Sequence, residues 1–71
     1  MPYINLKTTD DGVTVEQKAQ LVREFTDTLV NVLGKQPGHI HVVIDEVAEQ
    51  NWGYAGLLTE EYRRRISEPN A

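Results

Sequence analysis

The chain is organised around one segment, TVEQKAQLVREFTDTLVNVLG, which spans residues 14–34. It predicts a single helix that begins after Thr14 and ends at about Leu33. Thr14 and Gln17 have the spacing of a capping box, in which the two residues satisfy free N–H groups at a helix start. Gly34 is typical of the position just beyond a helix C-terminus.

Apolar residues recur along this segment at helical spacing and form a wide arc. Polar residues occupy the other side, and we expect them to face solvent. An arc this wide predicts contacts beyond one sheet. The apolar residues are Ala19, Val22, Phe25, Leu29, Val32 and Leu33, flanked by Val15, Leu21 and Val30, and the polar ones are Lys18, Arg23, Glu24, Asp27 and Asn31.

A strand is predicted on each side of this helix. Residues 3–8 alternate apolar and polar side chains. Residues 40–47 are almost continuously apolar, which predicts burial on both faces of the second strand. Turn-forming residues at 9–12 and 35–38 separate the strands from the helix. A helical crossover between two strands predicts a β-α-β unit with parallel pairing.

The rest of the chain predicts a hairpin or loop and a short helix. Gly53 and Gly56 lie three apart among aromatic residues, which favours a tight turn. Thr59 is a candidate cap for a helical turn that continues through Tyr62 and Ile66. Residues 67–71 are expected to fray.

Length and composition predict a single α+β domain, residues 1–71, that oligomerisation completes. A chain of 71 residues buries only about 60% of the surface of its unfolded form. The absence of cysteine removes disulfides and thiolate metal sites as supports. A lone β-α-β unit also has free strand edges, which pair readily with other strands. We therefore expect several copies to join their sheets.

The net charge and the distribution of apolar residues indicate which classes of partner the chain is not expected to bind. The net charge of −4 argues against binding to nucleic acid or to an anionic membrane. No apolar run approaches the roughly 20 residues that span a bilayer. The N-terminus has no basic region followed by an apolar stretch, so we expect no signal peptide and a cytoplasmic location.

Pro2 has two interpretations. Proline suits the first position of a strand because it has no N–H to donate. If Met1 is removed, however, Pro2 becomes a secondary amine whose ring fixes its direction. An α-amino group has a pKa of about 7.7–8.0, burial lowers that pKa, and a base near the working pH is efficient. The residues alone leave both interpretations open.

Other candidate residues also have an ordinary interpretation. His39 and His41 are expected to share one strand face, but no acidic or cysteine partner has metal spacing, so no metal site is predicted. Trp52 is either packing or a pocket wall, and Asn51 is either a pocket or a turn residue. The run at 63–65 (Arg-Arg-Arg) is either a solvated helix end or the source of an arginine for a neighbour's site.

Several features together resemble the 4-oxalocrotonate tautomerase family, the short-subunit branch of the tautomerase superfamily. They are Met1-Pro2 before the first strand, Glu16-Gln17-Lys18 at the helix start, the second strand ending in Asp45-Glu46, and Trp52-Gly53-Tyr54-Ala55-Gly56. The resemblance covers residues 2 to about 65. It implies a β-α-β fold, homo-oligomers that are usually hexamers, no cofactor, and catalysis by the amino-terminal proline, here Pro2.

The chain departs from the family at the arginines that clamp dicarboxylates. The arginine before the helix is replaced by Gly12-Val13, and the arginine on the second strand falls on His41. The active-site aromatic falls on Trp52. The resemblance therefore implies an isomerase with Pro2 as catalytic residue and with His41, Trp52 and Asn51 around the substrate. The substrate implied is an enolisable 2-oxo or 2-hydroxy acid, a small carboxylic acid with one carboxylate.

Two alternatives remain at this stage. Dehalogenases and decarboxylases of the same superfamily use the same proline, some of them through a hydration step. That step needs a positioned water activator, often an acidic residue, and Asp10, Asp11 and Glu46 are the residues considered for it. The other alternative is a non-catalytic oligomer that binds a small ligand.

Overall fold

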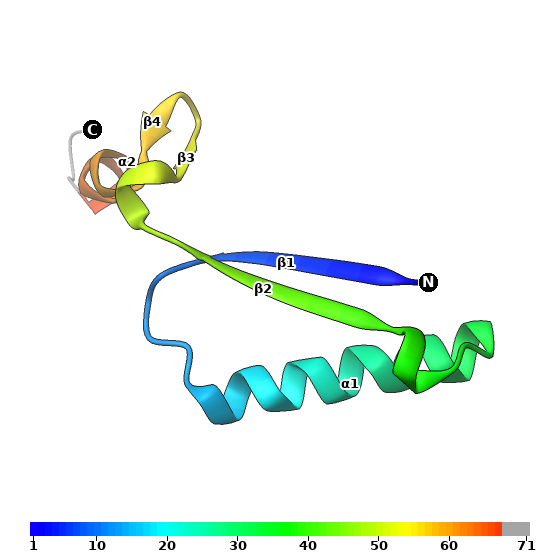
Figure 1. Ribbon diagram of the computed structural model, residues 1–71. Helices are drawn as coiled ribbons and strands as arrows, with labels where there is room; N and C mark the ends of the chain where they lie inside the picture. Colours follow the sequence, from blue (N-terminus) through cyan, green and yellow to red (C-terminus); the bar gives the residue numbers. More distant parts are fainter. Residues whose placement is uncertain (68–71) are drawn as a thin grey trace.

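The computed structural model describes residues 1–67. These residues form the predicted β-α-β unit (Figure 1). Strand β1 (Tyr3–Thr9) is followed by helix α1 (Val15–Leu33) and strand β2 (His41–Val47). The two strands are parallel, and α1 lies along one side of them. The fraying expected beyond Ser67 concerns residues outside the described part of the chain.

Helix α1 begins and ends as its sequence predicts. The Gln17 N–H donates to the Thr14 hydroxyl (3.1 Å), and the Thr14 N–H donates to the Gln17 side-chain oxygen (2.9 Å). At the other end Gly34 has a φ of 67°, and its N–H donates to the Val30 carbonyl (3.0 Å). A left-handed residue without Cβ ends the helix at little conformational cost.

Strand β2 starts one residue later than predicted. Residues Pro37–His39 form a short 3₁₀ helix, η1, so the expectation that His39 shares a strand face with His41 is wrong. The Ile40 N–H donates to the Pro37 carbonyl (3.2 Å) and is therefore not part of the sheet ladder. The register then runs from the Tyr3–His41 pair to the Thr9–Val47 pair.

The prediction that β2 is buried on both faces is wrong for the single chain. Val43 is 41% exposed because α1 covers only the other face. Lys18, which was expected to face solvent, instead forms an ion pair with Glu46 of β2. This pair places Glu46, and by alternation Val42 and Ile44, on the covered face.

The C-terminal arm, defined here as residues 49–67, contains the predicted hairpin and helix. A 3₁₀ turn, η2 (Glu49–Asn51), precedes strands β3 (Gly53–Tyr54) and β4 (Leu57–Leu58), which pair antiparallel. Ala55 and Gly56 both have positive φ (56° and 77°), as a two-residue hairpin turn of type I′ requires. Helix α2 (Thr59–Ser67) completes the arm, which lies at the end of β2 farthest from the N-terminus (Figure 1).

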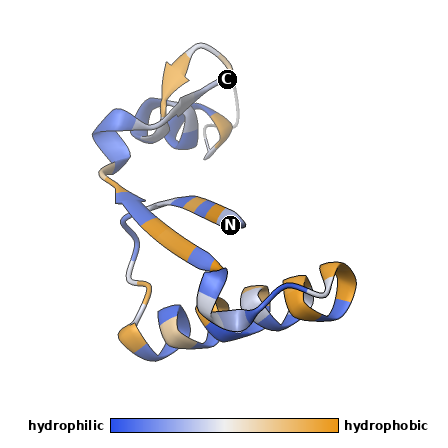
Figure 2. Ribbon diagram, turned by 45° about the vertical axis from the view of Figure 1, so that its right-hand side comes forward, coloured by the Kyte–Doolittle hydropathy of each residue, from blue (hydrophilic) through white to orange (hydrophobic). Residues whose placement is uncertain are grey.

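The described chain has almost no core of its own. None of its apolar side chains in residues 1–67 is fully buried, and the buried residue is Thr59, at 1% exposure. Tyr3 is 63% exposed and Val32 73%, and Figure 2 shows hydrophobic segments on α1, β2 and the hairpin. A two-stranded sheet is marginal in water without further packing. These surfaces therefore lack the cover that a stable fold needs.

The molecule is elongated, with extents of 53 × 22 × 19 Å. Neither α1 nor α2 combines the length and apolar character needed to cross a bilayer.

Candidate active site

Pro2 lies at the open end of the parallel sheet. The His41 N–H donates to the Pro2 carbonyl oxygen (3.1 Å), so the ladder extends one step before β1 begins. This bond fixes the backbone of Pro2 while the residue itself stays partly exposed. Pro2 and His41 are thus the two predicted site residues that the single chain brings together at the backbone.

Their side chains nevertheless point to opposite faces of the sheet. Tyr3 and His41 are partners in the register and share one face. Pro2 precedes Tyr3 by one residue, and successive side chains of a strand alternate between faces. The imidazole of His41 therefore does not face Pro2 of its own chain.

Asn51 ends η2 and Trp52 immediately precedes β3, so both belong to the C-terminal arm, which lies at the end of β2 farthest from the N-terminus (Figure 1). Strand β2 begins beside Pro2 and contains seven residues, which span about 20 Å at 3.3 Å per residue. Trp52 follows five residues beyond its end. Within one chain, Pro2 and Trp52 cannot line the same pocket.

The backbone of Trp52 is held by both of its polar groups. Its N–H donates to the Glu49 carbonyl (3.1 Å), and its carbonyl accepts from the Thr59 N–H (2.9 Å) and from the Thr59 hydroxyl (2.6 Å). Its side chain stays partly exposed, as expected for a ring in a small loop. Asn51 is exposed, and its N–H closes the η2 turn on Ala48 (2.8 Å).

Sequence reasoning did not connect Thr59 with Trp52. The hydroxyl of Thr59 was expected to cap a helix, but it donates to the carbonyl of Trp52 seven residues earlier. The signal was present in the hairpin, because Gly53 pairs with Leu58, and one further antiparallel step places Trp52 opposite Thr59.

The arginine run forms ion pairs inside the arm. Arg63 contacts Glu49 (2.8 Å), and this carboxylate raises the pKa of the guanidinium. Arg64 and Arg65 both contact Glu61. Their hydrogen bonds lower the pKa of that carboxyl, and the bond from Arg64 has the larger effect. These contacts favour the ordinary interpretation of the run as a solvated, paired helix surface.

The candidate acids lie at the end of the sheet opposite Pro2. Glu46 pairs with Lys18, and Asp11 accepts a hydrogen bond from the Thr9 hydroxyl (3.1 Å). The Asp10 N–H donates to the carbonyl of Val47, the last residue of β2 (2.8 Å). An acid that activates water beside Pro2 is therefore not supplied by these residues of the same chain.

Asp45 belongs to a small polar network on the uncovered sheet face. The Asn5 amide donates to its carboxylate (2.8 Å), and Lys7 contacts the same oxygen (2.9 Å). The hydrogen bond from Asn5 has the largest effect in lowering the pKa of Asp45, and the contact with Lys7 has the next largest. Within residues 1–67, no three His, Cys, Asp or Glu side chains form a group that could hold a metal ion.

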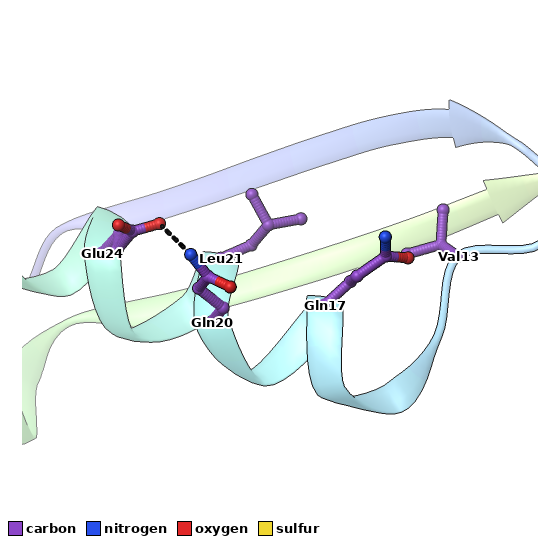
Figure 3. A pocket seen from close by; sticks show the side chains of 5 residues that line it. All are labelled: Val13, Gln17, Gln20, Leu21 and Glu24. Atoms are coloured by element: carbon purple, nitrogen blue, oxygen red, sulfur yellow. Dashed lines mark hydrogen bonds between the residues drawn. The ribbon is translucent and has the colours of Figure 1, made fainter.

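A shallow groove of about 310 Å³ runs along the first turns of α1 (Figure 3). Val13 and Leu21 form its apolar part, and Gln17, Gln20 and Glu24 its polar part, with Gln20 donating to Glu24 (3.3 Å). The groove begins near the end of β1 farthest from Pro2. It contains no cation to hold a carboxylate, so we do not assign it to the chemistry of Pro2.

Comparison with known proteins identifies the family. The model of the tautomerase enzyme family matches residues 2–62. A protein named probable tautomerase K2 from Dickeya dadantii is 48% identical over 67 residues, covering 94% of this chain and all of the relative. The crystal structure of DmpI from Helicobacter pylori superposes with a TM-score of 0.81 at 40% identity, over 89% of this chain and 97% of that one.

A 4-oxalocrotonate tautomerase isozyme from Methylibium petroleiphilum also gives a TM-score of 0.81, at 26% identity, and covers 90% of this chain and 98% of that one. Sequence and fold thus agree over nearly the whole described chain. The protein is a tautomerase, an isomerase, and belongs to the 4-oxalocrotonate tautomerase family of the tautomerase superfamily.

Proposed function

We propose that the chain, after removal of Met1, uses the amine of Pro2 as general base and then as general acid to tautomerise an enolisable 2-oxo acid. The observation that carries this proposal is that the family match begins at residue 2. The hydrogen bond from the His41 N–H to the Pro2 carbonyl supports it, because a base must be held in a fixed direction to work efficiently.

The reaction balances with one amine. The neutral amine of Pro2 takes the proton of the substrate's 2-hydroxyl. As the O–H electrons form the C=O bond, the C=C electrons shift to C-3, and C-3 takes the proton back from the protonated amine to form a C–H bond. No electron or group is gained or lost, and the same nitrogen serves first as base and then as acid.

We further propose that the working enzyme is a homo-oligomer, a hexamer, with sites shared between chains. The free strand edges, the uncovered face of β2 and the exposed apolar residues of α1 support self-association. The separation of about 20 Å along β2 supports a shared site. Trp52 and Asn51 of one chain then close the pocket around Pro2 of another and shelter its amine from water.

The substrate class follows from the residues at the two arginine positions. By the family resemblance, Gly12-Val13 and His41 stand where dicarboxylate-binding members have arginines, and Arg63 is engaged with Glu49. We propose that His41, supplied by a chain other than that of Pro2, donates one hydrogen bond to a substrate oxygen. A single neutral donor holds a carboxylate more weakly than a bidentate guanidinium, which favours a substrate with one carboxylate.

Solvent deuterium exchange tests the proposal. Uptake at C-3 is followed by proton NMR for 2-oxobutanoate, with one carboxylate, and for 2-oxoglutarate, with two. We expect the enzyme to accelerate exchange of the monoacid more than that of the diacid, and Pro2→Ala to lose most of this activity with its oligomeric state unchanged. Equal activity of Pro2→Ala would overturn the role of Pro2, and faster exchange of the diacid would overturn the substrate class.

A further inference from the structure

The C-terminal arm has a buried polar contact that its hairpin does not require. Residues 53–58 already pair through β3 and β4, and the Thr59 N–H continues this pairing to the Trp52 carbonyl (2.9 Å). The Thr59 hydroxyl adds a second, shorter bond to the same oxygen (2.6 Å). Thr59 is also the one fully buried side chain of the described residues, at 1% exposure.

Two further contacts hold α2 against the segment that carries Trp52. Arg63 of α2 reaches back to Glu49 (2.8 Å), whose carbonyl accepts the Trp52 N–H. The rings of Tyr54 and Tyr62 lie 4.4 Å apart with a tilt of 57°, a favourable arrangement for two aromatic rings. Together these contacts fix η2, the hairpin and α2 as one unit around the backbone of Trp52.

From these contacts we infer that Thr59 is a positioning residue, whose hydroxyl fixes the Trp52 carbonyl and thereby sets the direction of the indole ring that closes the pocket over Pro2. The inference rests on the proposed role of Trp52. A buried hydroxyl is costly unless it is hydrogen-bonded. Valine, which has the same shape without the polar atom, would fill this position more simply if packing were the only requirement.

The test uses the single tryptophan of the chain as its reporter. Thr59→Val keeps the volume of the side chain and removes the donor, and Thr59→Ser keeps the donor. For Thr59→Val we expect a red shift of Trp52 emission, easier quenching by acrylamide, and kcat/KM lowered about 2- to 10-fold, the range given by one hydrogen bond. Thr59→Ser should restore all three quantities close to those of the unaltered protein.

Thr28→Val is the matched control. The hydroxyl of Thr28 also donates to a backbone carbonyl, that of Glu24 (3.0 Å), but on the exposed surface of α1. This variant should leave the emission and kcat/KM unchanged. If Thr59→Val fails to assemble, Thr59→Cys takes its place, because a thiol keeps the size and donates weakly; the same changes are then expected in smaller amount.

Either of two results would overturn the inference: unchanged Trp52 emission in the Thr59 variant, or a changed emission with unchanged kcat/KM. A different variant, Trp52→Ala, tests whether Trp52 belongs to the site at all. If Trp52→Ala has full activity, Trp52 is not part of the site, whatever the emission of the Thr59 variants shows.

Discussion

If the sites are shared, two inactive variants should restore activity when they are mixed. One variant is Pro2→Ala, which lacks the ring-held amine, and the other is Trp52→Ala, which lacks the pocket wall. No chain in the mixture carries both residues intact. A site that combines Pro2 of one chain with Trp52 of another can still be complete, because each chain supplies the residue that the other lacks.

The fraction of sites that regain activity in the mixture follows from the geometry. Because β2 separates the two residues by about 20 Å, the proposed shared site takes them from different chains. In a random equimolar assembly, about one quarter of the sites then pair an intact Pro2 with an intact Trp52, whereas sites formed within one chain would give none. Unaltered protein mixed with Pro2→Ala serves as the reference and should retain about half of its sites.

The assay dissociates the two variants in denaturant, refolds them together, and confirms mixed assembly by native mass spectrometry. Solvent deuterium exchange into 2-oxobutanoate then measures the active sites. We expect activity well above the sum of the two parents refolded separately. Mixed oligomers with no gain over that sum would show that Pro2 and Trp52 of different chains do not form a common site.

Three further predictions concern the stability of the elements that hold the site. Thr14→Ala removes the helix cap and should lower the free energy of unfolding by about 1 kcal/mol per subunit, measured by urea denaturation; an unchanged midpoint would contradict the cap's contribution. The hydrogen bond from Asn5 is the largest cause of the lowered pKa of Asp45. The ionised carboxylate therefore stabilises the fold at pH values above the pKa of the unfolded state. This stabilisation is lost as the pH falls through the lower pKa of the folded state. Carboxyl NMR titration of Asn5→Ala should therefore find the pKa of Asp45 raised, and an unshifted titration would refute this cause. Gly53→Ala places a Cβ 2.9 Å from the Leu57 carbonyl, so it should lower the melting temperature and shift tryptophan emission, whereas unaltered values would show that the hairpin tolerates the methyl group.

The β-α-β unit was predictable from local chemistry alone. The capping box at Thr14 and the left-handed Gly34 give the limits of α1 without any knowledge of the rest of the molecule. The glycines at 53 and 56 likewise indicate a tight hairpin or loop, although the positive φ of Ala55 was not predicted, because a residue with a Cβ rarely adopts it. These features are decided within a few residues, so the sequence contains the necessary information.

The burial of β2 and the direction of the site residues could not be predicted in this way. An apolar run such as Val42-Val43-Ile44 indicates that both faces become covered, but not whether the cover comes from the same chain. The position of His41 beside Pro2, on the opposite face of the sheet, depends on a register that only the paired strands reveal. The contact of Thr59 with Trp52 likewise requires the hairpin register. Homo-oligomeric assembly and the cytoplasmic location stay predictions.

The proposed base is the nitrogen of Pro2, and this role requires that the nitrogen be a free amine. A single glycine inserted between Met1 and Pro2 leaves a chain in which the proline nitrogen is an amide without a basic lone pair. The measurement is kcat/KM for exchange into 2-oxobutanoate, with intact mass confirming that the unaltered protein has lost its methionine. We predict a loss of about 10²- to 10⁴-fold, the usual contribution of a general base, in an oligomer of unchanged size. If the glycine-insertion variant assembles and keeps the kcat/KM of the unaltered protein, the nitrogen of Pro2 is not the base.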